Sequence, residues 1–194
     1  MVQIKAEPIK PILERINEII TFFVEKRNTD IRLHSTRANY RFTSEYENIR
    51  LRLKLEINTT EHFHVLPWVS FPFEVTNDWY SGKAEIKTYS INELLGTKLR
   101  ALYKRSKGRD LFDLYYAHQH TQIDHSEIIG CFKAYMNFVV DKPPTKKQFL
   151  INLEEKENDP SFIGDMEGLL RNGIEYKQAD AFKWIRNELI SELD

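Results

Sequence analysis

The sequence predicts an α+β fold, with a small, mostly antiparallel sheet followed by a C-terminal helical bundle. Two patterns carry this prediction: apolar and polar residues alternate in the first part, and apolar residues recur at helical spacing beyond residue 90. With 194 residues, of which 41% are hydrophobic, the chain is long enough for one core or two small subdomains. We place the division between a strand part, residues 1–89, and a helical part, residues 90–194.

The strand part is expected to open with a helix. Pro8 introduces an amphipathic, strongly apolar segment that extends to Val24. Residues 31–42 and 49–58 then have the pattern of strands. In the second of them leucine and isoleucine alternate strictly with charged residues, which places Glu56 on the polar face.

An aromatic segment leads from these strands to the helices. Residues 62–82 are rich in aromatic residues, prolines and turn residues, and we expect them to pack as a loop against the core, with a further strand at residues 84–88. Beyond Asp110 the whole chain has helical spacing. The later helices are predicted at residues 126–140, 145–155, 161–171 and 178–193.

The helix that follows Ser90 contains a charge inside its apolar face. Ser90 followed by Glu93 matches a capping box. The apolar stripe consists of Ile91, Leu94, Leu95, Leu99 and Leu102. Lys98 lies one turn after Leu94, so its ammonium starts from the inward side, and Arg105 lies two turns further along. A cation in such a place usually indicates chemistry or a buried ion pair.

The next helix supplies the acids for such a pair. We expect Gly108 to end the first helix in a left-handed cap and Asp110 to open the second. The tight connection then collects five charged residues in one polar pocket: Lys98, Arg105, Arg109, Asp110 and Asp113. From the residues alone, Lys98 either joins the two helices through an aspartate or binds a phosphate, and Asp110 is either a cap or a catalytic group.

Residues 98–102 are Lys-Leu-Arg-Ala-Leu, and residues 109–115 are Arg-Asp-Leu-Phe-Asp-Leu-Tyr. This pattern resembles the signature of the AbiEii/AbiGii nucleotidyltransferase toxins of abortive-infection and toxin–antitoxin systems. Residues 53–58 are similar to the family strand that ends in an acidic residue. The likeness covers residues 31–118 and is looser in the flanking helices.

The resemblance implies an enzyme that transfers a nucleotide from a nucleoside triphosphate (NTP) to an RNA or protein acceptor with the help of Mg²⁺. The residues it implies are Lys98, Asp110 and Asp113 as catalytic groups, Lys98, Arg105 and Arg109 as phosphate-binding groups, and Glu56 as a metal ligand. Without the family, Glu56 is interpreted as one partner of a cross-strand salt bridge.

One family motif has no counterpart in this sequence. Family members carry, upstream of this region, a Gly-Ser or Gly-Gly turn and then an Asp-x-Asp pair that holds the metal ions, and neither occurs here. Because Mg²⁺ needs such carboxylates, we expect the chain to be the back part of a nucleotidyltransferase, with an incomplete sheet, and to be inactive on its own. The alternative is a non-catalytic domain of this family that binds a partner or RNA.

The resemblance also suggests partners. Family members act as toxins with a separate antitoxin, so we expect an antitoxin or the missing N-terminal half as a protein partner. An incomplete sheet leaves an exposed edge that a helix, a partner or a second copy of the chain has to cover. A homo-oligomer is therefore one expected arrangement. The net charge of −1 argues against RNA binding by bulk electrostatics, but the arginines of residues 32–54 can form a local basic face.

Cysteine and histidine content indicates the compartment and the metal chemistry. The single Cys131 excludes an intramolecular disulfide and predicts a cytoplasmic protein, and the absence of a long apolar run predicts no membrane association. His62 and His64 lack further ligands nearby, so a metal site there is not expected. His118 and His120 are expected to interact with a helix end or with solvent.

Overall fold

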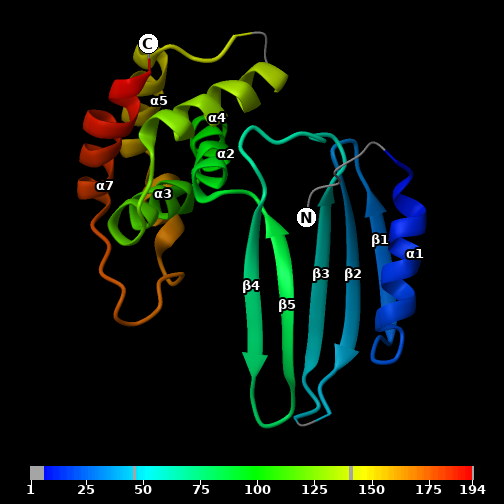
Figure 1. The fold of residues 1–194 in the computed structure, drawn as a ribbon. Helices are drawn as coiled ribbons and strands as arrows, with labels where there is room; N and C mark the ends of the chain where they lie inside the picture. The colour runs from blue at the N-terminus through cyan, green and yellow to red at the C-terminus, as the bar shows by residue number, and fades with distance from the viewer. Residues whose placement is uncertain (1–6, 46, 140–141, 194) are drawn as a thin grey trace. The chain divides into compact units, whose positions relative to one another are not determined.

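The computed structural model describes residues 7–45, 47–139 and 142–193. The chain divides into two compact units, residues 1–63 and residues 64–194, whose elements are labelled in Figure 1. The α+β prediction is confirmed, because antiparallel sheets of three and two strands precede the helices. The division that the sequence predicts after residue 89 lies where the strands end and the helices begin. As a domain boundary it stays a prediction.

The first unit is one helix packed on a three-stranded antiparallel sheet. Its elements are α1 (Ile9–Ile20), β1 (Lys26–Ile31), β2 (Ser35–Thr43) and β3 (Arg50–Asn58), with the strands in that spatial order. Leu13 of α1 packs against Ala38, Tyr40 and Ile57 of the sheet, and the Tyr40 hydroxyl donates a hydrogen bond of 2.9 Å to Asn17. The helix therefore covers the apolar face.

The opposite face of this sheet is charged. Side chains alternate between faces along a strand, so residues that are directly opposite in the register share a face. Arg37 lies opposite Glu56, and Arg41 lies opposite Arg52. Lys26 of β1 lies opposite Arg41 on its other side. Positive side chains thus dominate the face that α1 does not cover.

Strand β1 is the element of this unit that the sequence did not predict. Its residues, Lys-Arg-Asn-Thr-Asp-Ile, show no apolar alternation because nearly all of their side chains are exposed. Pairing with β2 over the full length of β1 gives it its place in the sheet. An edge strand of this kind has no local signal for a sequence pattern to detect.

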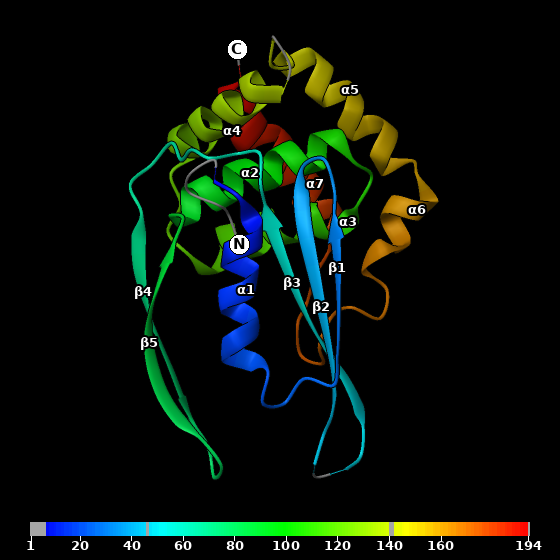
Figure 2. The same ribbon diagram turned by 90° about the vertical axis from the view of Figure 1, so that its right-hand side faces the viewer.

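The second unit begins with a hairpin and continues as helices. The hairpin strands are β4 (Val69–Thr76) and β5 (Ser81–Thr88), and the side chain of Asn77 accepts hydrogen bonds from the backbone of Trp79 and Tyr80 in the turn. The helices, which Figure 2 shows from a second side, are α2 (Ile91–Lys104), α3 (Gly108–His120), α4 (His125–Val139), α5 (Lys146–Glu157), α6 (Pro160–Ile163) and α7 (Gln178–Trp184). A 3₁₀ turn, Gly164–Met166, follows α6. A π-helical turn, Ile185–Leu189, directly continues α7, and a second 3₁₀ turn, Ile190–Glu192, follows it.

Two expectations for this unit are wrong. The aromatic segment does not pack as a core loop: Phe71 is 56% exposed and Trp79 is 85% exposed, although Trp68 stacks on Tyr89. The helix expected at residues 161–171 ends within its first turns. Gly168 follows with a φ of +72°, in a left-handed conformation that stops a helix.

The helices enclose one apolar core and pack very closely at two glycines. A Cβ added to Gly96 of α2 would lie 2.5 Å from the Cβ of Cys131 in α4, and one added to Gly108 would lie 2.5 Å from the carbonyl oxygen of Phe162. Gly108 starts α3 and does not cap α2, so that expectation is wrong as well. Cys131 is fully buried, and burial raises the pKa of its thiol to about 11. Among the described residues, no helix has the length and apolar character to cross a bilayer.

Candidate functional site

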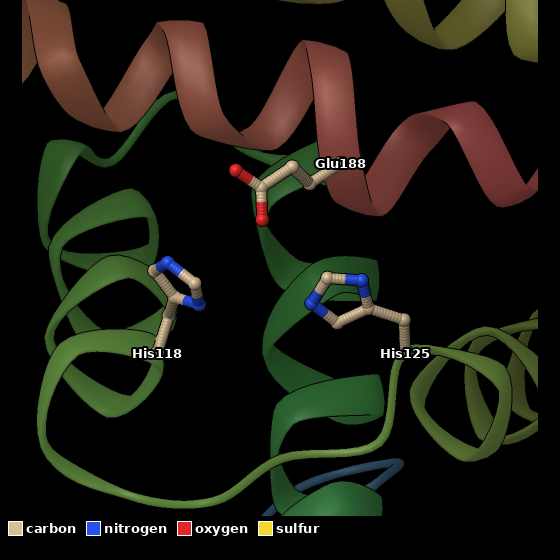
Figure 3. A group of neighbouring side chains, drawn as sticks. All are labelled: His118, His125 and Glu188. Atoms are coloured by element: carbon tan, nitrogen blue, oxygen red, sulfur yellow. The ribbon is translucent and has the colours of Figure 1, made fainter.

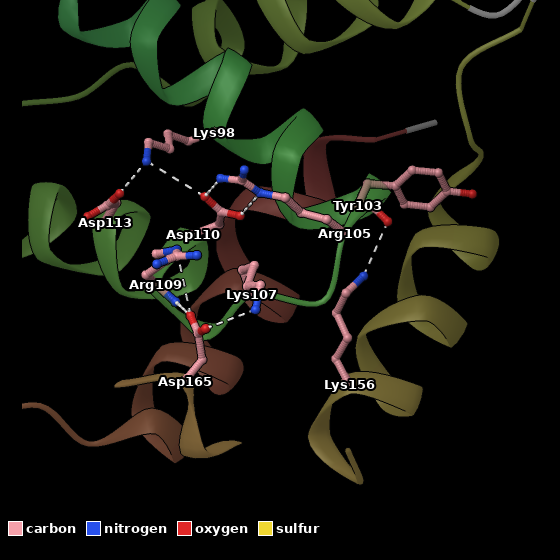
Figure 4. Close-up of polar contacts among 9 residues, drawn as sticks. All are labelled: Lys98, Tyr103, Arg105, Lys107, Arg109, Asp110, Asp113, Lys156 and Asp165. Atoms are coloured by element: carbon pink, nitrogen blue, oxygen red, sulfur yellow. Dashed lines mark hydrogen bonds and ion pairs between the residues drawn. The ribbon is translucent and has the colours of Figure 1, made fainter. Parts of the chain in front are cut away.

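Four of the charged residues that the sequence singled out meet where α2 and α3 join, and we call them the Lys98 cluster: Lys98, Arg105, Asp110 and Asp113 (Figure 4). The Lys98 ammonium lies 2.5 Å from Asp113 Oδ2 and 3.6 Å from Asp110 Oδ1. Its side chain is 38% exposed, whereas that of Asp110 is completely buried. Lys98 therefore connects a buried acid to the surface and does not point into the core.

Arg105 holds Asp110 from the other side. Its Nε donates to Oδ2 and its Nη2 donates to Oδ1, both at 2.7 Å, in a bidentate pair. These hydrogen bonds are the largest cause that raises the pKa of Arg105, and the negative charges of the nearby aspartates add to it. Asp110 is the third residue of α3 and not its cap, which is Lys107, but an acid in the first turn still interacts favourably with the helix dipole. The helix dipole and two cations thus compensate this buried charge.

Arg109 does not join the Lys98 cluster, although the sequence placed it there. It turns to Asp165, with Nε 3.8 Å from Oδ2, and its backbone N–H donates to the same oxygen at 3.2 Å (Figure 4). Lys107 Nζ lies 3.3 Å from the other oxygen. Burial raises the pKa of Asp165, but the hydrogen bonds from Arg109 and Lys107 outweigh it and lower the pKa overall. Lys107, Arg109 and Asp165 form a separate Asp165 cluster.

Glu56 lies in the first unit, on the charged face of its sheet. Arg37 Nε is 2.5 Å from its Oε1, and Lys54 Nζ is 2.7 Å from its Oε2. The hydrogen bonds from Lys54 and then from Arg37 lower the pKa of Glu56. The cross-strand salt bridge inferred from the residues alone is confirmed, and a role for Glu56 as a metal ligand stays a prediction.

Sequence reasoning missed the role of Glu93. This carboxylate is completely buried and accepts hydrogen bonds from the backbone N–H groups of Val65 (2.8 Å) and Leu66 (3.0 Å) and from the Tyr135 hydroxyl (2.7 Å). Its own N–H donates to Ser90 Oγ, so half of the expected capping box is present while the carboxylate anchors the loop before β4. The sequence contains no local signal for this, because the partners lie 27 to 42 positions away.

Lys156 is the second group that the sequence did not single out. Its side chain is buried, its ammonium donates to the Tyr103 carbonyl oxygen at 3.2 Å and to Asn152, and burial lowers its pKa to about 8 (Figure 4). It lines a pocket of about 330 Å³ whose wall also includes Lys104 and Arg105. Arg105 therefore belongs both to the Lys98 cluster and to this cation-rich pocket.

Comparison with known proteins places these features in context. The model of a family described as nucleotidyl transferase AbiEii toxin, type IV toxin–antitoxin system, matches residues 3–188. A crystal structure of a candidate nucleotidyltransferase from H. pylori is similar with a TM-score of 0.51 and 16% identity, over 98% of this chain and 77% of that one. JHP933 from Helicobacter pylori gives a TM-score of 0.49 and 17% identity over 98% and 75% of the two chains. No curated protein matches the sequence. At 16% identity, the similarity to the candidate H. pylori nucleotidyltransferase structure with a TM-score of 0.51 shows a shared fold.

Proposed function

The chain belongs to the AbiEii nucleotidyl transferase toxin family of type IV toxin–antitoxin systems, and from this premise we propose that it is a divergent nucleotidyltransferase that binds an NTP at the Lys98 cluster. The transferred nucleotide would go to an RNA or protein acceptor. The observation that carries the proposal is the state of Lys98, whose ammonium is fixed by two aspartates while its side chain is 38% exposed. A cation held in place at the surface can meet a phosphate without first being ordered.

The residues of the Lys98 cluster take different roles in this proposal. Lys98 supplies a point charge for a phosphate, and Asp113, at 2.5 Å, positions that charge. Asp110 holds Arg105 in a fixed orientation at the wall of the neighbouring pocket, where Lys104 and Lys156 add positive charge. A triphosphate that starts at Lys98 would continue along these cations.

Neither Glu56, the candidate metal ligand, nor the candidate catalytic groups Asp110 and Asp113 fit an Mg²⁺ cage in their present state. Glu56 is engaged by Arg37 and Lys54, Asp113 by Lys98, and Asp110 by Arg105 as well as Lys98. Mg²⁺ usually binds through one or two carboxylates together with substrate phosphates. We therefore propose that Mg²⁺ enters with the triphosphate and that transfer depends on an Asp-x-Asp pair that these 194 residues do not contain.

The test is a titration of the purified chain with ATP, GTP, CTP and UTP, with and without Mg²⁺, by calorimetry. We expect at least one NTP to bind, and Lys98→Met to weaken that binding about tenfold or more, the scale of a lost charge-assisted contact. Lys147→Met, which removes an exposed lysine on α5, is the matched control and should leave the affinity unchanged. Absence of binding by all four nucleotides would remove the proposal for this chain.

A second candidate function, RNA binding by the first unit, rests on the charged sheet face. Lys26, Arg41 and Arg52 form a row across the three strands, and the register places no acid opposite any of them. Like charges directly opposite one another destabilise a sheet, so binding of an anion such as an RNA backbone would reduce the electrostatic repulsion within this row. We expect Arg41→Glu/Arg52→Glu to lower both RNA affinity and its salt dependence. Lys10→Glu, on the helix that covers the opposite face, should change neither.

Type IV membership implies an antitoxin partner. We propose further that the chain acts in the cytoplasm in phage defence, and that the antitoxin, an N-terminal half carried by another segment, or a second copy covers an edge of the sheet. Light scattering of the chain alone, and copurification with an antitoxin encoded beside it, distinguish these partners. A strictly monomeric chain that retains neither protein would contradict this part of the proposal.

A further inference from the structure

A second group of side chains lies at the far end of α3 from the Lys98 cluster. His118 is in the last turn of α3, His125 is the first residue of α4, and Glu188 is in the π-helical turn that continues α7 (Figure 3). One ligand atom from each of the three lies within 4.8 Å of the others. We propose that these residues form a binding site for a transition-metal dication of the Zn²⁺ type.

The donor set fits this class of ion. Two neutral imidazoles and one carboxylate are the protein ligands of many zinc sites that keep one position open, and hard ions such as Mg²⁺ prefer oxygen ligands alone. In a tetrahedral site with bonds of about 2.1 Å, neighbouring donor atoms lie about 3.4 Å apart. The present spread of up to 4.8 Å closes to that value through small side-chain rotations, chiefly of the exposed Glu188.

The three donors are also available. Within the described ranges of the chain, no hydrogen bond or ion pair engages the side chain of His118, His125 or Glu188. Both imidazoles are half-buried, where polar groups normally have partners. A bound cation would supply the missing partner to all three at once.

The surroundings hold the imidazoles in place. The His118 ring stacks on Trp184, with ring centroids 4.6 Å apart and an interplanar angle of 23°, and the His125 ring lies 6.1 Å from the same indole. Trp184 is buried and lies one turn before Glu188. The π-helical turn from Ile185 to Leu189 is a rare geometry that often marks functional positions, and it carries the carboxylate.

A metal at this site would join three elements that are distant in the sequence. The last turn of α3, the start of α4 and the C-terminal helix each contribute one ligand. Because the unfolded chain does not hold the three donors together, the ion would bind the folded state preferentially and stabilise it. The ion would therefore hold the C-terminal helix to α3 and α4. This role does not depend on the proposed nucleotide site.

The experiment is a titration of the metal-free full chain with Zn²⁺ alone, by calorimetry, together with thermal unfolding with and without Zn²⁺. We expect one Zn²⁺ per chain and a higher Tm. Changes to groups that only support a metal ligand cost 10- to 100-fold in affinity, so loss of a ligand in His125→Ala or Glu188→Gln should cost at least tenfold. His120→Ala is the matched control: this exposed histidine, also on α3, bonds to the Tyr116 carbonyl oxygen and should be silent.

A spectroscopic readout locates the ion. Ni²⁺ at the site should quench the fluorescence of Trp184, and the quenching should vanish in both Trp184→Phe and Glu188→Gln. Glu188 is exposed, so its substitution leaves the core intact. Absence of stoichiometric Zn²⁺ binding, or binding that is unchanged in His125→Ala and Glu188→Gln, would overturn the proposal.

Discussion

Glu56 in the first unit and Asp110 in the second each contact two cations, but in opposite surroundings. Glu56 lies on an open sheet face, with its side chain 36% exposed, between Arg37 and Lys54. Asp110 is completely buried at a helix start, between Arg105 and Lys98. The same set of charges is a weak surface interaction in the first unit and a necessary compensation of a buried charge in the second.

The comparison is tested most strongly by removing one cation from the buried acid. We expect Arg105→Met to lower the free energy of unfolding by about 3 kcal/mol, because Asp110 stays buried with only Lys98 at 3.6 Å. Urea unfolding followed by tryptophan fluorescence measures this for the second unit, which contains all three tryptophans. A loss below about 1 kcal/mol would mean that Asp110 needs no compensation and that the contrast with Glu56 is wrong.

Glu93 extends the comparison to a buried acid that is held by N–H and O–H donors. Glu93→Gln keeps the shape but replaces one acceptor oxygen with an amide that faces the donors of the loop, so we expect a loss of about 2 kcal/mol. The same urea experiment measures it. Glu154→Gln, the same change at an exposed position of α5, is the control, and an equal loss there would show that the effect is not specific to the buried carboxylate.

Lys156 provides the reverse case, a buried cation. Its folded-state pKa of about 8 lies below the unfolded value of 10.5, so between these values the unfolded chain binds more protons and stability rises with pH. Below pH 8 the penalty for charging Lys156 is fully present. We expect this group to contribute a rise of about 1 kcal/mol per pH unit, which Lys156→Met should abolish. Parallel pH profiles of the two proteins would refute this assignment.

The smallest effect is expected at Glu56. Glu56→Gln should change the stability of the first unit by less than about 1 kcal/mol, because both ion pairs are partly exposed and screened by salt. Hydrogen exchange of the β2 and β3 amides measures this unit separately, since it contains no tryptophan. A larger loss, insensitive to salt, would place Glu56 in the same class as Asp110.

The sequence predicted the elements that carry their own local signals. The Ser90 cap sets the start of α2, the Thr145–Gln148 capping box starts α5, and alternating leucines define β3. From the spacing of the charges it also predicted that Lys98 and the two aspartates of α3 meet. These features depend on residues that are close together in the chain.

Features set by distant contacts could not be predicted in this way. Arg109 turns away from the Lys98 cluster because it interacts with Asp165. Asp165 lies 56 positions further along the chain, where no local pattern indicates the contact. His118 was expected to interact with a helix end or with solvent; it lies in the last turn of α3, and its ring also stacks on Trp184, which only the packed C-terminal helix brings near. Aromatic residues in the β4–β5 hairpin suggested a core, yet Phe71 and Trp79 are exposed, because aromatic content alone does not determine burial.

The close contact between Gly96 and Cys131 makes the reactivity of this cysteine a measure of how often α2 and α4 separate. Cys131 is the only cysteine, it lies where α2 and α4 meet, and its thiol, with a pKa of about 11, is almost entirely protonated at neutral pH. An alkylating reagent reacts with the thiolate, so it can label this protein only when the two helices separate. The labelling rate in the absence of denaturant therefore reports the free energy of opening the helical unit, with no engineered cysteine.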